Sequence, residues 1–265
     1  MELWQMLLLA TLQGVTEFLP VSSSGHLVLL ESVLLENTDS NLNLIEVNVV
    51  LHLGTLLTIL VFYRRRIGTM IREDRRTLRL LAVGTLPAIV VGYPFKRFFE
   101  TALTNPIVAG ILLTVTGVIL LATSRLTVGK NGLQTLSYRS AFLIGLGQSA
   151  AVLPGLSRSG TTIATALWLG TDRRASADFS FLLAIPVIAG AGVLQAVDLM
   201  QNARTTTPLL NLAVGALVAF SVGILALRWL LKWLEAGRLS WFAWWCVPLG
   251  IVALVWHLAV STPGS

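Results

Sequence analysis

The sequence is poor in cysteine and in charged residues. One of its 265 residues, Cys246, is a cysteine, and only 12% are Asp, Glu, Lys or Arg. A single cysteine excludes an internal disulfide and a metal site built from several cysteines. Soluble domains contain about 25% charged residues, so the low charge argues against a soluble protein. The opening residues, Met1 to Trp4, lack the basic cluster of a cleaved signal peptide, and no N-terminal targeting segment is expected.

Apolar residues, in contrast, make up 55% of the chain. They gather in several windows of about 20 residues, the length that an α-helix needs to cross a bilayer. We therefore expect an all-α polytopic membrane protein in which residues 1–265 form a single integral membrane domain. The net charge of +6 does not indicate a nucleic-acid partner. The basic residues lie between apolar runs, where they orient a protein in the membrane.

Eight apolar segments divide the chain. Two of them, at about 3–34 and 137–170, are interrupted in the middle by polar sequence that contains proline. We interpret these two as re-entrant helical hairpins and the others as six transmembrane helices. Because three spans follow each hairpin, halves of about 1–130 and 131–265 would form an inverted-topology repeat. The six spans are predicted at about 47–63, 79–98, 105–124, 177–199, 208–231 and 241–260.

The basic residues set the orientation of this arrangement, because inner loops carry an excess of Lys and Arg. With both termini outside, 15 of the 19 basic residues fall in inner loops, and only Lys96, Arg97 and Arg204 fall in outer ones. We therefore expect both termini on the outer side. The inner set is Arg64, Arg65, Arg66, Arg72, Arg75, Arg76, Arg79, Arg125, Lys130, Arg139, Arg173, Arg174, Arg228, Lys232 and Arg238.

The interruptions of the two hairpins resemble each other. Several residues of the first recur 135 positions later in the second: Gln13, Ser22, Ser24 and Gly25 return as Gln148, Ser157, Ser159 and Gly160. Lipid tolerates broken helical backbone only where protein or a water-filled cavity covers it. Paired breaks in corresponding halves of a membrane protein commonly mark a binding site near the midplane. We expect the functional site where the two hairpin tips meet.

The polar motifs of the hairpins carry the ionisable residues Glu17, His26 and Arg158. An ionisable residue at the centre of a membrane helix costs about 2.5–3.5 kcal/mol on insertion, so a functional role is expected for them. The Ser-rich tips suit helix N-termini, which offer free N–H groups to an anion. Arginine, hydroxyls and a proton-handling acid are the parts of a phosphoryl-transfer site. His52 has no polar motif around it and is expected to be structural.

The motifs resemble those of the bacterial undecaprenyl-diphosphatase (bacitracin-resistance) family. The resemblance rests on residues 13–26, QGVTEFLPVSSSGH, and on residues 154–162, PGLSRSGTT. Residues 178–186, DFSFLLAIP, are also similar to the sequence that follows the second motif in that family. The first position of the family's acidic motif is Glu or Gln. Because it is Gln13 here, Glu17 would carry the acid–base or metal role alone.

The resemblance implies a multi-pass enzyme of the bacterial plasma (inner) membrane with its site on the outer, periplasmic side. It would hydrolyse undecaprenyl diphosphate, a polyprenyl diphosphate lipid, with a divalent cation (Mg²⁺ or Ca²⁺) bound at Glu17. Ser23, His26 or water would attack the terminal phosphorus, and the sequence does not choose among them. The oligomeric state is also open. The implied catalytic residues are Glu17, Ser23, His26 and Arg158, and the implied substrate-binding residues are Gln13, Ser22, Ser24, Gly25, Ser157, Ser159, Gly160, Thr161 and Thr162.

Two other classes of membrane protein share parts of this pattern. Inverted repeats with broken helices are also typical of transporters, so a transporter or flippase of a polyprenyl phosphate is the main alternative. Acid-phosphatase-like lipid phosphatases also use Ser-Gly-His and Ser-Arg elements. They need a second histidine soon after the Ser-Arg pair, and none follows Arg158 before His257.

Overall fold

The computed structural model describes residues 1–35, 44–92, 94, 100–127, 129–202 and 207–261. Within this part of the chain every regular element is a helix, and Asn131 and Thr171 form one isolated β-bridge. The all-α class predicted from the sequence is confirmed. In chain order the elements are α1 (Leu3–Thr16), α2 (Ser23–Leu35), α3 (Leu44–Phe62), α4 (Arg64–Arg72), α5 (Arg75–Pro87), η1 (Ala88–Gly92), α7 (Glu100–Leu103), α8 (Pro106–Thr123), η2 (Leu133–Thr135), α9 (Tyr138–Ala150), α10 (Arg158–Trp168), α11 (Arg173–Asn202), α12 (Leu209–Glu235), η3 (Leu239–Phe242) and α13 (Ala243–Ser261).

Several helices are long and apolar enough to cross a membrane. Among the described residues four meet this condition: Pro106–Thr123, Arg173–Val197, Leu209–Glu235 and Leu239–Ala259. Glu46–Phe62 becomes a fifth when it is joined to Arg64–Arg72, although the pair is bent by 68°. The loop expected after the first span is therefore itself helical. The predicted span 79–98 is helical as far as Gly92, and most of its remainder lies outside the described residues.

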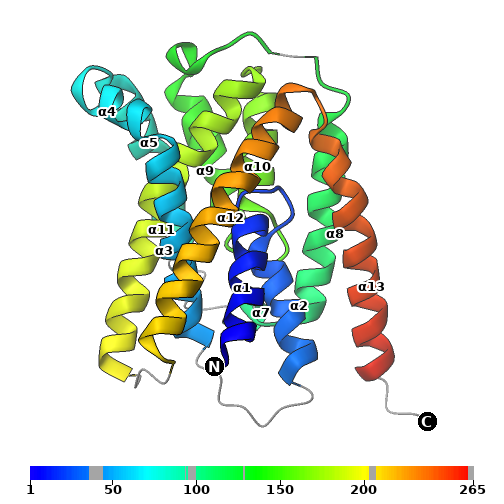
Figure 1. Cartoon of the computed structure of the whole chain (residues 1–265). Helices are drawn as coiled ribbons and strands as arrows, with labels where there is room; N and C mark the ends of the chain where they lie inside the picture. The colour runs from blue at the N-terminus through cyan, green and yellow to red at the C-terminus, as the bar shows by residue number, and fades with distance from the viewer. Residues whose placement is uncertain (36–43, 93, 95–99, 128, 203–206, 262–265) are drawn as a thin grey trace.

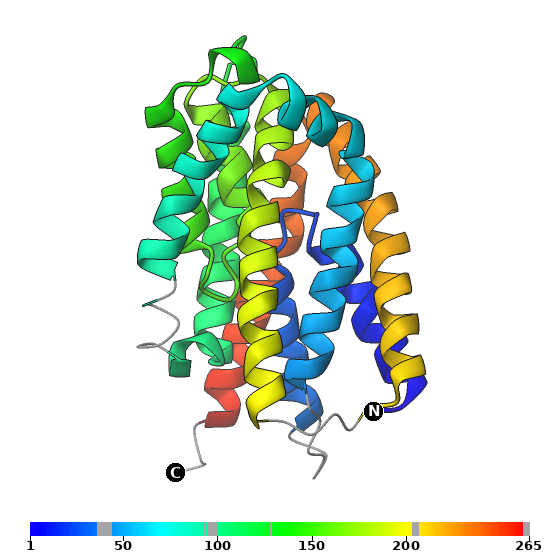
Figure 2. The same ribbon diagram turned by 90° about the vertical axis from the view of Figure 1, so that its left-hand side faces the viewer.

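Two pairs of shorter helices run only to the middle of the molecule. The pair α1 and α2 starts and ends at the end that carries both termini, and α9 and α10 come from the opposite end (Figure 1). The turns of both pairs lie near mid-height, as the view rotated by 90° also shows (Figure 2). Both helix pairs occupy the ranges predicted for the hairpins. We call their turns the first tip (residues 17–22) and the second tip (residues 151–157).

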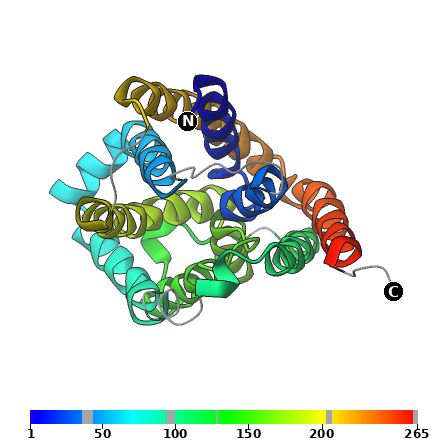
Figure 3. The same ribbon diagram turned by 90° about the horizontal axis from the view of Figure 1, so that it is seen from below.

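The longer helices pack around these pairs and hold them in place. In the view along the helices, α13 lies beside α8 at one edge, whereas α1, α3 and α12 lie together at another (Figure 3). Small residues allow close contact between helices, as is common in membrane proteins. A Cβ on Gly145 of α9 would clash with the carbonyl oxygen of Gly84 in α5. The second pair is thus seated directly against α5.

Candidate active site

Each tip ends in a serine that caps the helix after it. The Ser157 Oγ accepts a hydrogen bond of 3.1 Å from the Gly160 N–H at the start of α10. The Ser22 Oγ accepts one of 3.3 Å from the Gly25 N–H at the start of α2. Serine is among the preferred residues at this position, because its hydroxyl satisfies an N–H that has no partner within the helix. The local sequence therefore determines where α2 and α10 begin.

The two tips also contact each other directly. The Gly155 N–H donates to Ser22 Oγ at 3.1 Å, and Ser159 Oγ donates to the Leu19 carbonyl at 3.2 Å. A Cβ on Gly25 would lie 2.7 Å from the Gly155 Cα, closer than side-chain atoms normally approach. Ser22 adopts a φ of 66°, the left-handed region that serine rarely occupies. The junction of the tips is therefore tight and locally strained.

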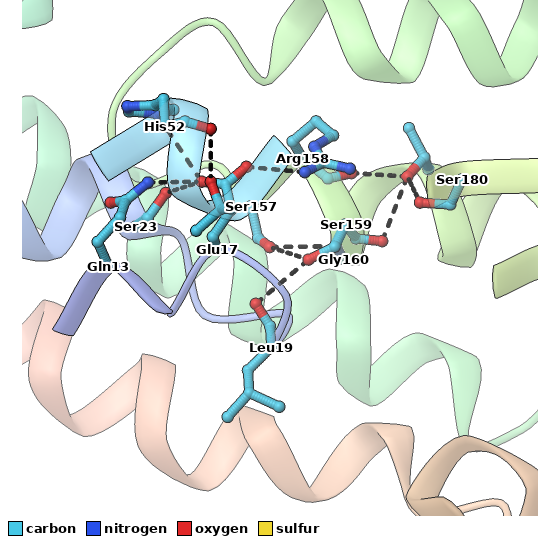
Figure 4. A network of polar contacts seen from close by, with 12 residues as sticks. Gln13, Glu17, Leu19, Ser23, His52, Ser157, Arg158, Ser159, Gly160 and Ser180 are labelled. Carbon is cyan, nitrogen blue, oxygen red and sulfur yellow. Dashed lines mark hydrogen bonds and ion pairs between the residues drawn. The ribbon is translucent and has the colours of Figure 1, made fainter. Parts of the chain in front are cut away.

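An ion pair connects the hairpins beside this junction (Figure 4). Arg158 Nη2 donates to Glu17 Oε1 at 2.8 Å, and both side chains are largely buried. The other carboxylate oxygen, Glu17 Oε2, accepts from Ser23 Oγ at 2.8 Å and from Gln13 Nε2 at 3.1 Å. One carboxylate thus holds an arginine of the second hairpin and a hydroxyl of the first.

Glu17, Ser23 and Arg158 line a cavity of about 260 Å³ between the tips and α11. Most of its polar lining comes from the two hairpins and α3, although Ala151, Val152 and Leu156 of the second tip are apolar, and the wall that α11 contributes is mostly apolar. Its lining residues are Thr16, Glu17, Ser22, Ser23, Ser24, His52, Gln148, Ala151, Val152, Leu156, Ser157, Arg158, Val187, Ile188, Ala191, Gly192 and Gln195.

The predicted site residues divide into two groups. Six of them line the cavity: Glu17, Ser22, Ser23, Ser24, Ser157 and Arg158. The others surround those six, and several hold them in place: Gln13, Gly25, His26, Ser159, Gly160, Thr161 and Thr162. Thr162 illustrates the second group, since its hydroxyl bonds the Arg158 carbonyl at 2.7 Å and Ser180 Oγ at 2.6 Å.

His26 turns toward α13. Its Nδ1–H donates to the Ser22 carbonyl at 2.8 Å, and its Nε2 accepts from the Trp245 indole at 2.9 Å. Thr161, the counterpart of His26 in the second hairpin, makes the matching bond to the Ser157 carbonyl at 2.7 Å. Both ring nitrogens therefore already have partners within the protein, and His26 itself does not line the cavity. A catalytic role for His26 stays a prediction that this arrangement does not favour.

His52 enters the site although its sequence context suggested a structural role. Its Nδ1–H donates to the Asn48 carbonyl at 2.8 Å, which leaves Nε2 facing the site, 3.9 Å from Glu17 Oε2. His52 was expected to be structural, and the structure places its imidazole in the lining of the cavity, beside Glu17. Its place in an apolar run gave no signal, because only the packing of α3 against the first hairpin brings it to the cavity.

A divalent cation would have few protein ligands here. Within the described part of the chain, no group of three or more His, Cys, Asp or Glu side chains is arranged to hold a metal ion. Glu17 is the one carboxylate among the residues that line the cavity. Mg²⁺ often binds through one or two carboxylates together with substrate phosphates and water. The donor set fits a cation that the substrate itself helps to hold.

Comparison with known sequences decides the family. The model of the bacitracin resistance protein BacA family matches residues 6–252. This chain belongs to the BacA family. A Rhodopirellula baltica relative, an undecaprenyl-diphosphatase, is 46% identical over 97% of this chain and 99% of its own length. An undecaprenyl-diphosphatase of Halothermothrix orenii is 36% identical over 96% and 98% of the two chains, and undecaprenyl-diphosphatase 4 of Bacillus cereus is 39% identical over 93% and 94%.

The family resemblance inferred from the two motifs is thus confirmed. In this BacA-family chain the match extends over both hairpins and most of the helices around them.

Proposed function

We infer that the chain is a membrane undecaprenyl-diphosphatase, which hydrolyses undecaprenyl diphosphate to undecaprenyl phosphate and inorganic phosphate. This reaction recycles the lipid carrier for cell-wall synthesis. The relatives of the chain carry this activity in their names. The observation that carries the inference for this chain is the hydrogen-bonded series Arg158–Glu17–Ser23, which combines a cation, an acid and a hydroxyl in one cavity.

The site is suited to bind a diphosphate. Arg158 supplies a guanidinium, which matches phosphate oxygens in geometry and charge. The N-termini of α2 and α10 converge on the same region, and each contributes the positive end of a helix dipole. The apolar wall of α11, which includes Val187 and Ile188, suits the first part of a polyprenyl chain.

Ser23 is the nucleophile that the geometry supports best. Its hydroxyl already donates to Glu17 Oε2, so the carboxylate can accept the proton as Ser23 Oγ attacks the terminal phosphorus. The bond from that phosphorus to the bridging oxygen then breaks, and undecaprenyl phosphate leaves. Water hydrolyses the phosphoserine, releases inorganic phosphate and restores the serine. Arg158 offsets the negative charge throughout.

A divalent cation at Glu17 is part of this proposal. When bound, it would neutralise charge on the diphosphate and polarise its oxygens. Glu17 and the substrate oxygens would hold it, with water in the remaining positions.

We propose that the two short helix pairs are re-entrant hairpins, and that the site opens to the periplasm between six spans that form an inverted repeat. The Arg-rich helix α4 lies at one end of the molecule and both termini lie at the other (Figure 1). An excess of basic residues is typical of the cytoplasmic side. The cavity follows α11 from Val187 to Gln195, toward the end with the termini. This supports an outward-facing site.

The test is phosphate release from a C55 polyprenyl diphosphate by the purified protein in detergent. We expect release by the wild type, its loss after EDTA treatment, and its recovery when Mg²⁺ or Ca²⁺ is added back. The Arg158→Ala variant should be inactive under all three conditions. A folded wild type that binds the lipid and releases no phosphate would favour the transporter alternative.

A further inference from the structure

Two cavity-lining side chains have hydrogen-bonding atoms without a partner among the described residues. Gln148 is only 2% exposed, and both its Nε2 and its Oε1 are unpaired there. Arg158 Nη1 is also buried without an acceptor in that part of the chain, although Nη2 of the same guanidinium is paired with Glu17. Buried polar groups in folded proteins nearly always have partners, so an exception requires an explanation. Both residues line the same cavity.

The internal repeat explains why Gln148 has no partner within its own hairpin, whose residues are all described. Its counterpart Gln13 donates to Glu17, four residues later at the C-terminal end of α1. The residue four positions after Gln148 is Val152, whose side chain cannot accept a hydrogen bond. The second hairpin therefore has the glutamine amide but lacks the carboxylate that accepts a hydrogen bond from this amide in the first hairpin. The amide stays available to a ligand in the cavity.

We propose that Gln148 is a substrate-binding residue that holds the diphosphate together with Arg158. Its Nε2–H donates a hydrogen bond to a phosphate oxygen. The unpaired Arg158 Nη1–H donates to the same oxygen. The Oε1 of Gln148 accepts from a protonated phosphate oxygen or from water bound to the phosphate. This inference rests on the proposed diphosphatase function and adds a residue to its phosphate-binding site. A bound diphosphate would also supply hydrogen-bonding partners to the unpaired atoms of Gln148 and Arg158.

The proposal is tested with Gln148→Met, which keeps the length of the side chain and removes both hydrogen-bonding ends. Ser149→Ala is the matched control, because Ser149 is buried on the same helix, its hydroxyl donates to the Gly145 carbonyl and it lies outside the cavity lining. Two quantities are measured: the kinetics of phosphate release from the C55 diphosphate, and the affinity for inorganic diphosphate by calorimetry in the same buffer. Melting temperatures establish that each variant is folded.

We expect Gln148→Met to lower kcat/KM by about 10- to 100-fold, the usual effect of losing a hydrogen bond to a charged group. Its affinity for inorganic diphosphate should fall by a similar factor, while Ser149→Ala stays within about twofold of the wild type. Gln148→Glu should lower both kcat/KM and the affinity for inorganic diphosphate further, because a carboxylate repels the phosphate.

A role in packing alone predicts that Met rescues both activity and affinity. If Gln148→Met binds and turns over like Ser149→Ala, the proposal is overturned. A wild type that binds inorganic diphosphate but hydrolyses nothing would count against the proposed function, and the affinities of the variants would still decide the role of Gln148.

Discussion

Arg158 Nη2 lies 2.8 Å from Glu17 Oε1, although the two residues are 141 positions apart in the chain. This bond joins the second hairpin to the first at the point where the cavity begins. Because both side chains are largely buried, each charge depends on the other for its stability. The pair is therefore both a structural link between the two halves and the charged centre of the site.

Removing one member of this pair should destabilise the protein more than removing both. Arg158→Ala leaves the Glu17 carboxylate buried without its cation, a change that costs about 3–5 kcal/mol in comparable buried pairs. The double variant Glu17→Gln, Arg158→Ala has no such charge, so we expect its melting temperature to exceed that of Arg158→Ala. Both variants should release phosphate at least about 100-fold more slowly than the wild type. Strictly additive losses of stability would show that the two charges are not coupled.

The contact between the two tips should tolerate no added side chain. In Gly25→Ala the new methyl group would lie 2.7 Å from Gly155 Cα, which forces the hairpins apart. Overpacking of this kind costs about 1–3 kcal/mol, so the melting temperature should fall by roughly 2–10 °C. Phosphate release should fall with it. Gly190→Ala in α11 is the control, because a Cβ there meets no atom of the described residues within 4 Å. Equal behaviour of the two variants would contradict the tight junction.

The tips and their partnership could be predicted from the sequence. A polar stretch that contains proline and lies inside apolar sequence can adopt few backbone arrangements in a membrane. Its repetition indicates a shared site. The motifs alone therefore place Glu17, Ser23 and Arg158 together. The ring orientation of His26 could not be predicted, because it depends on Trp245 in α13, 219 positions away. The position of His52 in the cavity lining could not be predicted for the same reason. It depends on how α3 packs against the first hairpin, and the residues around His52 in the sequence do not indicate that contact.

The proposed orientation predicts which surfaces face the outside of the cell. The native chain is a suitable background for cysteine labelling, because Cys246 is buried. A Cys introduced at Glu2, near the N-terminus, should react in intact cells with a maleimide that cannot cross the membrane. A Cys introduced at Gly68, in α4 at the opposite end, should react only after the cells are permeabilised. The reverse labelling pattern would show that the protein has the opposite orientation, with the cavity opening toward the cytoplasm.

The central claim is that the Ser23 hydroxyl, activated by Glu17, attacks the terminal phosphorus between the two tips. The most direct test traps the phosphorylated protein during turnover of C55 diphosphate labelled with ³²P in its terminal phosphate, and maps the label by mass spectrometry. The account predicts phosphoserine at Ser23, which is absent in Ser23→Ala and still formed in His26→Gln. Phosphohistidine at His26, or full turnover by Ser23→Ala, would contradict it.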